Sequence, residues 1–102
     1  MSPQERAWRS QLAKIVSSGG LLRGCLLERD RSCGKPYCRC ARGQKHHSLY
    51  LVLGEGGRYR QLFVPKEYEP QVRQWMANAH AVRDLLKDVS EIYWQKIQRR
   101  EL

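Results

Sequence analysis

Three cysteines and a histidine lie close together near the middle of this 102-residue chain, in the spacing Cys33-x4-Cys38-x-Cys40-x5-His46. Zinc prefers four thiolate or imidazole ligands in a tetrahedral arrangement, and a loop that contains glycine and proline can turn tightly enough to gather such neighbours. Lysine and arginine side chains between the cysteines favour the thiolate form that a metal needs. The spacing therefore predicts a closed, structural Zn²⁺ site with the ligands Cys33, Cys38, Cys40 and His46.

The fourth zinc ligand is open to alternatives. His47 adjoins His46 and is the second choice, and Cys25 is the third. Because Cys25 falls within a predicted strand, where a free cysteine usually packs as a small apolar side chain, we expect it to be buried and outside the site. The first residues contain no apolar segment typical of an export signal. This favours a cytoplasmic protein whose thiols bind metal over one that forms disulfides.

The chain is strongly basic, with 19 lysine and arginine residues against ten acidic ones and a net charge of +9. Nine of the basic residues and only three of the acidic ones lie in residues 23–65, around the cysteines and the segment that follows them. Arginine binds phosphate and guanine edges through two parallel hydrogen bonds, so this segment predicts a nucleic-acid-binding surface. The residues expected on that surface are Lys35, Arg39, Arg42, Lys45, Arg58 and Arg60, together with Tyr59. Tyr59, Tyr50 or Tyr37 is expected to stack on bases.

A small antiparallel sheet is expected between two helices. Residues 21–29 predict a strand, and residues 30–47 predict a loop that holds the metal ligands. Two further runs, 48–53 and 58–64, predict a β-hairpin across a glycine-rich turn. Because strand side chains alternate, a turn of even length puts two sets of residues on opposite faces. One set is Tyr50, Val52, Tyr59, Gln61 and Phe63, and the other is Leu49, Leu51, Leu53, Arg58, Arg60, Leu62 and Val64.

A helix is expected near each end of the sequence. Residues 2–18 begin with the pattern of a capping box and carry apolar residues at helical spacing. Residues 66–100 carry a longer amphipathic pattern, in which Pro70 marks either the start of the helix or the end of a short preceding turn. The apolar stripe of this long helix exceeds what the first helix and a small sheet can cover, which predicts an interface with a second copy or a larger partner. The residues expected in that interface are Trp75, Val82, Leu86, Val89 and Tyr93.

Together these elements predict one α+β domain over residues 1–102. It combines the N-terminal helix of residues 2–18, a zinc loop and β-hairpin within 21–64, and the long helix of residues 66–100. No apolar run reaches the length of a membrane span, so no membrane partner is expected.

The residues around the cysteines resemble a family of short bacterial and archaeal proteins that carry a domain of unknown function. The similarity is carried by Cys33-Gly34-Lys35-Pro36-x-Cys38-x-Cys40, by Arg23-Gly24 before it and by Lys45-His46 after it, and it covers roughly residues 20–95. The resemblance implies the same four zinc ligands, Cys33, Cys38, Cys40 and His46, because the family's pattern keeps three cysteines and one histidine at these positions. The position of Cys25 is usually a serine in that family, which implies that Cys25 is not a ligand. Members of that family are found near mobile elements, so the resemblance also implies a role in DNA or RNA transactions. The chain departs from the family's pattern at His47-Ser48 and at Pro70.

The function expected from these features is that of a small zinc-containing protein that binds DNA or RNA as an accessory subunit of a prokaryotic nucleoprotein or mobile-element machine. The alternative is a dimerisation or interaction scaffold that acts through the long helix. An enzyme is not expected, because the sequence holds no phosphate-binding loop, no serine nucleophile motif and no cluster of carboxylates that would suggest a nuclease. No small-molecule substrate is expected either.

Overall fold

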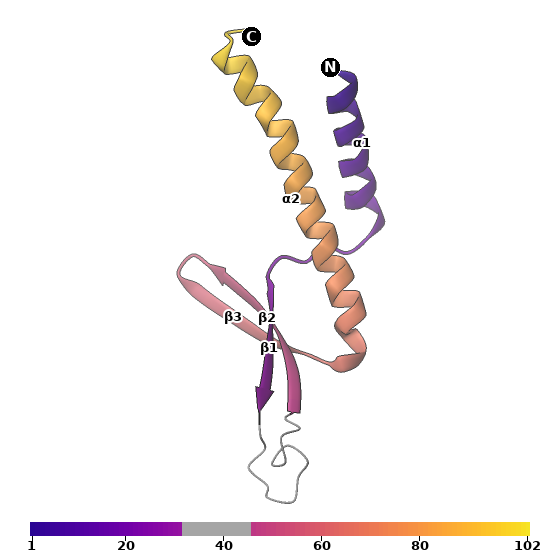
Figure 1. Cartoon of the computed structure of the whole chain (residues 1–102), viewed down its shortest axis with the longest axis vertical. Coiled ribbons are helices and arrows are strands. Elements are labelled where there is room, and N and C mark those ends of the chain that lie inside the picture. Colours follow the sequence, from indigo (N-terminus) through magenta and orange to yellow (C-terminus); the bar gives the residue numbers. More distant parts are fainter. Residues whose placement is uncertain (32–45) are drawn as a thin grey trace, which may run out of the picture. The chain divides into compact units, whose positions relative to one another are not determined.

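The computed structural model describes residues 1–31 and 46–102 of the chain. A helix precedes and a long helix follows a three-stranded antiparallel sheet, which confirms the predicted α+β class (Figure 1). The elements in chain order are α1 (Pro3–Ser18), β1 (Cys25–Arg31), β2 (His46–Glu55), β3 (Arg58–Val64), the short 3₁₀ turn η2 (Lys66–Tyr68) and α2 (Glu69–Gln98).

Contacts along the chain divide it into two compact units. The helical unit comprises Met1–Arg23 together with Arg73–Leu102, and the sheet unit comprises Gly24–Val72. The sheet unit therefore holds the three strands, η2 and the first turn of α2. The helical unit holds α1 and the rest of α2.

The sheet has the order β1-β2-β3, and both neighbouring pairs are antiparallel. β1 begins at Cys25, four residues later than the strand predicted over 21–29. Gly24 has a φ of +139°, and a β-carbon there would lie 2.9 Å from a carbonyl oxygen of β2. Only glycine tolerates that conformation, and the chain turns into the sheet there. Before this point the N–H of Leu22 bonds to the carbonyl oxygen of Trp75 in α2, so the preceding residues belong to the helical unit.

The two strands of the hairpin are joined by the two-residue turn Gly56-Gly57, whose φ angles are +57° and +77°. Positive φ at both central residues is typical of the type I′ turn, which matches the twist of the strands that it connects. The turn has an even length, and its register pairs Leu49 with Val64 and Tyr50 with Phe63. The predicted division of the hairpin into two faces is therefore confirmed.

One face of the sheet holds its buried core. Leu49 and Val64 are 2% and 5% exposed and lie opposite each other on β2 and β3. The other face is open, since Tyr59 and Phe63 are 64% and 53% exposed.

In the helical unit, α1 begins as predicted but completes only half of the expected capping box. Ser2 is the N-cap, and its Oγ accepts a hydrogen bond of 3.1 Å from the backbone N–H of Glu5. Instead of returning to the backbone of Ser2, the buried Glu5 carboxylate accepts hydrogen bonds from Arg9 Nε at 2.7 Å and from the Tyr93 hydroxyl at 2.8 Å. Arg9 also donates to the Tyr93 hydroxyl at 2.8 Å, so the three side chains form a closed network.

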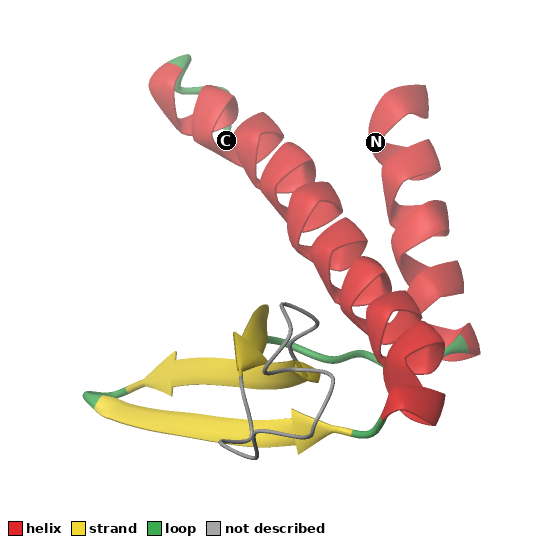
Figure 2. Cartoon of the chain, turned by 60° about the horizontal axis from the view of Figure 1, so that its bottom comes forward, coloured by secondary structure: helices red, strands yellow, loops and turns green. Residues whose placement is uncertain are grey.

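In the helical unit, α1 and α2 lie side by side and run antiparallel (Figures 1 and 2). The Glu5 network joins the start of α1 to the C-terminal half of α2. Beyond the other end of α1, Asn78 Nδ2 donates to the carbonyl oxygen of Gly20 at 3.1 Å, and the ring of Trp75 lies against Gly20. Val89, between these two tethers in the sequence of α2, is buried.

Pro70 lies in the first turn of α2, directly after η2, so a short turn does precede the main helix. The missing N–H of proline costs nothing there, because the first turn has no partner for it within the helix. From Glu69 the helix runs for 30 residues, about 45 Å. Among the residues that the structure describes, no helix is both long and apolar enough to cross a membrane.

The Glu5 network predicts that the helical unit loses stability in acid. Hydrogen bonds from Tyr93 and Arg9 lower the pKa of Glu5 below its ordinary value of 4.5. A carboxyl with a lowered pKa in the folded state stabilises the fold above the unfolded value, and this stability is lost as the pH falls below about 4.5. Thermal unfolding followed by circular dichroism should therefore show a Tm that declines below that pH.

In Glu5→Gln and Tyr93→Phe we expect a lower Tm at pH 7 and a weaker decline in acid, because each removes one side of the network. Glu91→Gln, which changes an exposed carboxylate on α2, is the matched control. An equally steep acid decline in Glu5→Gln and in the unsubstituted protein would show that the network does not contribute.

Candidate nucleic-acid interface

Most of the predicted metal site lies outside the described residues. This holds for Cys33, Cys38 and Cys40, and also for the predicted phosphate contacts Lys35, Arg39, Arg42 and Lys45 and for Tyr37. The described ranges 1–31 and 46–102 contain no cluster of three or more side chains that could hold a metal. The predicted zinc site therefore stays a prediction.

The residues on either side of this segment nevertheless belong to paired strands of the sheet. His46 is the first residue of β2, and its backbone pairs with Arg31, the last residue of β1. The two residues that flank positions 32–45 are consequently neighbours in the antiparallel ladder. The predicted first and last ligands, Cys33 and His46, are thus within two positions of the same backbone pair. That geometry suits a ligand set closed within one loop.

Cys25 differs from its prediction. It is exposed rather than buried, because it is the first residue of β1 and lies on the open face of the sheet. It pairs with Val52, at the opposite end of the β1–β2 ladder from Arg31 and His46. Six strand positions at about 3.4 Å each separate Cys25 from the base of the predicted zinc loop, about 20 Å. The strand geometry thus places it away from the loop base.

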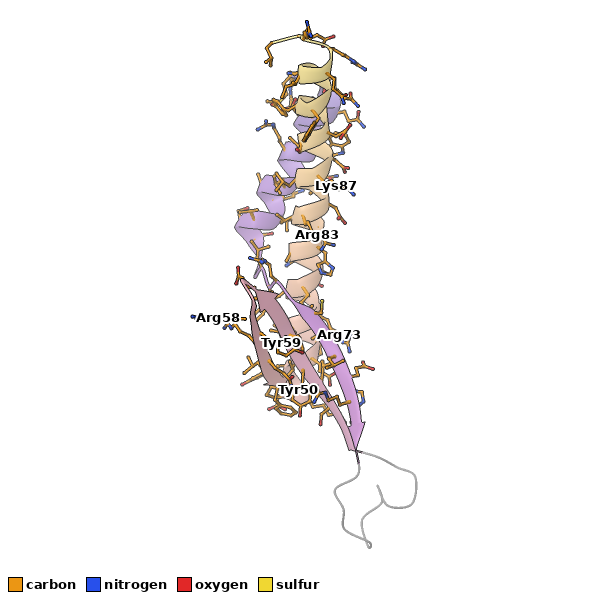
Figure 3. The ribbon with its side chains drawn as sticks, turned by 90° about the vertical axis from the view of Figure 1, so that its left-hand side faces the viewer. Tyr50, Arg58, Tyr59, Arg73, Arg83 and Lys87 are labelled. Atoms are coloured by element: carbon orange, nitrogen blue, oxygen red, sulfur yellow. The ribbon has the colours of Figure 1, made fainter. Side chains whose placement is uncertain are left out.

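β3 is the most exposed strand. It lies at an edge of the sheet, and every residue of Arg58–Phe63 is exposed while Val64 is buried. Arg58 and Arg60 are on the face of Leu49, whereas Tyr59 is on the opposite face, as the alternation predicted. Figure 3 shows Tyr59 on the sheet and Arg58 extending from its edge. One edge strand therefore presents cations to one side and aromatic rings to the other.

A row of three side chains crosses the open face from strand to strand. Tyr50 on β2 meets Phe63 on β3 edge to face, with ring centroids 5.8 Å apart and planes at 68°. The guanidinium of Arg29 on β1 lies 5.4 Å from the centroid of the Tyr50 ring, a cation–π contact. Tyr50 therefore contacts both of the other side chains. Figure 3 labels Tyr50 on the sheet.

Neither Arg29 nor Phe63 was among the predicted contacts. The alternation had put Phe63 on the face of Tyr50 and Tyr59, and that signal was sufficient to find it. Arg29 could not be found in this way, because its face depends on the pairing of β1 with β2, which places Arg29 opposite Ser48. The first strand had been predicted in a different range.

The basic residues are spread more evenly than the sequence segments indicated. The helical unit holds ten basic and five acidic side chains, net +5, and the sheet unit holds nine and five, net +4. Within the sheet unit, the acidic residues Glu67 and Glu69 follow β3, so residues 24–65 retain eight basic against three acidic side chains. The strands and the loop between them are thus the basic part of that unit.

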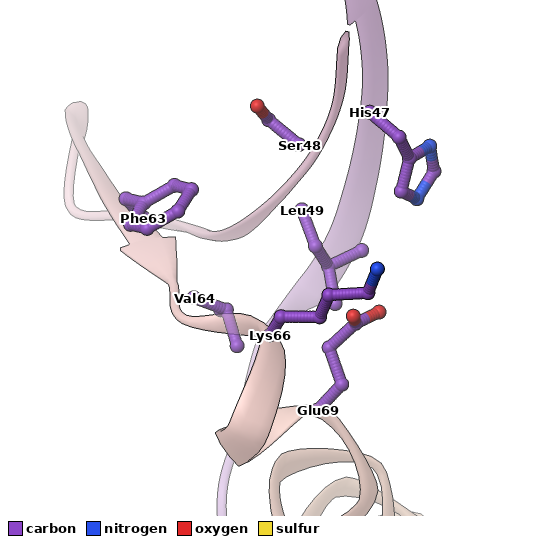
Figure 4. Close-up of a pocket in the computed structure, with 7 residues that line it drawn as sticks. All are labelled: His47, Ser48, Leu49, Phe63, Val64, Lys66 and Glu69. Carbon is purple, nitrogen blue, oxygen red and sulfur yellow. The ribbon is translucent and has the colours of Figure 1, made fainter.

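A shallow pocket opens at one end of the hairpin (Figure 4). Seven residues of the sheet unit line it, and Phe63 stands across from His47, Lys66 and Glu69. The lining brings together one cation, one carboxylate and an imidazole, so its charges offset and do not favour a phosphate. Its other lining residues are Ser48, Leu49 and Val64.

The predicted interface residues of α2 have mixed surroundings. Val89 is buried, Val82 is half-buried, and the hydroxyl of Tyr93 is held by Glu5. Trp75 lies against Gly20 and keeps 38% of its surface exposed. Of the five, Leu86 is the most open, and Trp94 and Ile97 of the same helix are also exposed.

The sequence comparisons give a family but no activity. The pattern of the domain of unknown function DUF6788 matches residues 2–74. The chain belongs to this family. No curated protein and no solved structure matches the chain.

The DUF6788 match differs in extent from the resemblance seen over residues 20–95. It includes α1 and ends soon after the start of α2. The exposed strand β3 and the row of Arg29, Tyr50 and Phe63 lie inside the DUF6788 segment. The exposed residues Leu86, Trp94 and Ile97 lie beyond it.

Proposed function

We propose that this DUF6788 protein binds nucleic acid through its sheet unit. The observation that carries the proposal is β3, in which Arg58 and Arg60 are exposed on one side of an edge strand and Tyr59 and Phe63 on the other. Cations supply the salt-dependent attraction to phosphates, and exposed rings supply surfaces for bases. This part of the edge strand suits the task, because Arg58–Phe63 is exposed along its length and a partner can reach both faces there, whereas only Val64 enters the core.

We propose that the segment between β1 and β2 adds cations to the same surface. Residues 32–45 carry Lys35, Arg39, Arg42 and Lys45, and the residues that flank this segment, Arg31 and His46, pair in the sheet. We propose that Zn²⁺ bound by Cys33, Cys38, Cys40 and His46 fixes this loop. A closed site of four protein ligands supplies folding energy and no open position for chemistry, so no catalytic role is proposed. The protein would act as an accessory subunit of a larger nucleoprotein assembly.

A second candidate is an interaction scaffold. Leu86, Trp94 and Ile97 expose 59%, 63% and 61% of their surfaces on α2, and such a group of large apolar side chains is typical of a protein interface. Because these residues lie outside the DUF6788 match, this function would be additional to that of the family segment.

For nucleic-acid binding, we expect Arg58→Ala and Arg60→Ala each to weaken the affinity for a fluorescent oligonucleotide several-fold at low salt. Each should also reduce by about one the slope of log K against log salt, since one phosphate contact is lost. Arg99→Ala and Arg100→Ala, in the turn just after α2, are matched controls and should change little. Equal losses in all four variants would show that only net charge matters.

For the zinc site, we expect one Zn²⁺ per chain and one rapidly reacting thiol in the native protein. Cys25 is exposed and would react, whereas metal binding would protect the other three cysteines. Titration with a chromogenic disulfide should give one fast thiol, and four after unfolding with a chelator. Cys25→Ser should remove the fast thiol and keep the metal, and Cys38→Ser should lose the metal. Four fast thiols in freshly reduced native protein would contradict the site.

For the scaffold, sedimentation of the protein at tens of micromolar should show a dimer that Leu86→Glu converts to a monomer, because the charge would be buried without a partner. Lys87→Glu introduces the same glutamate at the next position, which is exposed, and should leave the dimer intact. A single species near 12 kDa in all three samples would contradict the proposal of a homodimer.

A further inference from the structure

The aromatic rings on the open face of the sheet differ in how much of their surface neighbouring side chains cover. The ring of Tyr50 is contacted by the guanidinium of Arg29 and by the ring of Phe63. Tyr50 is also only half exposed, whereas Tyr59 and Phe63 expose 64% and 53% of their surfaces. Tyr50 therefore acts as a support that orients Arg29 and Phe63. The rings available to a ligand are those of Tyr59 and Phe63.

The spacing of these two rings limits what the ligand can be. Tyr59 and Phe63 are four residues apart on one strand, which corresponds to about 13 Å. Bases stacked in a duplex are about 3.4 Å apart and cover one another's faces. Neighbouring stacked bases could therefore not reach both rings, and duplex bases would have no free face to offer. A strand whose bases are splayed apart satisfies both conditions.

The surroundings of the two rings also suit a base. Gln61 lies between them on the same face and is exposed, and its amide can donate to and accept from a base edge. Arg29, at the other end of the row, presents a guanidinium plane on which a base can stack. On the opposite side of β3, Arg58 and Arg60 are within reach of phosphates that follow the open edge of the sheet.

We propose that this face binds single-stranded nucleic acid, with unpaired bases stacked on Tyr59 and Phe63 and the phosphates held by Arg58 and Arg60. The inference rests on the proposed function and adds the class of substrate to it. The charge of the strands and their loop, eight basic against three acidic side chains in residues 24–65, favours a polyanion over a second copy of this basic protein as the occupant of the face.

The test compares a fluorescent twelve-nucleotide thymidine oligomer with the same oligomer paired to its complement. Both are titrated by anisotropy at low salt with the full-length protein. We expect the single strand to bind at least tenfold more tightly. Tyr59→Ala and Phe63→Leu should each weaken binding of the single strand about tenfold, which is typical of one lost stacked base, and should leave duplex binding nearly unchanged.

Two further variants separate stacking from folding. Phe63→Trp retains an aromatic plane and should keep the single-strand affinity, even if Phe63→Leu alters the packing on Tyr50. Tyr68→Leu removes an exposed tyrosine that belongs to η2 and to none of the strands, and should have no effect. Circular dichroism should show the same fold in every variant that is compared.

The failures of the two proposals are distinguishable. Equal affinity for both oligomers, lowered by Arg58→Ala and Arg60→Ala but not by Tyr59→Ala or Phe63→Leu, would overturn the stacking inference and keep the proposed function. No detectable binding of either oligomer at low salt would overturn both. Weaker binding in Phe63→Trp equal to that in Phe63→Leu would also overturn the stacking inference.

Discussion

The pairing of Leu49 with Val64 determines which side chains the sheet buries and which it presents. Side chains alternate along a strand, so a slip of one position would exchange the two faces of β3 and put Phe63 in place of Val64 in the core. The two-residue turn Gly56-Gly57 fixes this register, because its positive φ angles are those of a type I′ turn. The exposed surface of β3 is thus a consequence of the conformation of two glycines in the turn. The same register brings Tyr50 against Phe63 and, through β1, against Arg29.

The helical unit is organised by polar tethers as well as by apolar packing. Glu5 is nearly inaccessible, and a buried carboxylate is tolerated only when its hydrogen bonds are satisfied. Arg9 and Tyr93 both donate to it, from the same helix and from the facing helix. At the other end, Asn78 and Trp75 hold the residues that leave α1. Leu86 and Ile97 remain exposed on α2, and this part of the helix lies outside the family match.

The elements that depend on local pattern could be predicted from the sequence. Both helices, the hairpin and its two faces follow from periodicity, capping and turn chemistry, which act over a few residues. The start of β1 could not be predicted, because it depends on the conformation of Gly24 and on a hydrogen bond between Leu22 and a distant turn of α2. The capping box was wrong in its second half for a similar reason: Tyr93, far along the chain, provides the partner of Glu5.

The candidate site was predictable only in part. Alternation placed Arg58, Arg60 and Tyr59 correctly on their faces, since it needs no tertiary information. The burial expected for Cys25 was wrong, because Cys25 is the first residue of β1 and lies on the open face of the sheet, where it is exposed to solvent. The contribution of Arg29 depends on which residue it meets across the sheet, and a single sequence carries no information on that pairing. The zinc ligands lie almost entirely outside the described residues and remain a prediction from spacing alone.

The central claim is that bases contact the open face of the sheet, and photo-crosslinking tests it most directly. A single-stranded oligomer that carries one 5-iodouracil joins, on irradiation, to an aromatic side chain stacked on that base. Mass spectrometry of the digested complex then locates the joined residue. The account predicts crosslinks at Tyr59 and Phe63 that disappear when an excess of unlabelled oligomer competes. Competable crosslinks found only in the helical unit, for example at the exposed Trp94, would contradict it.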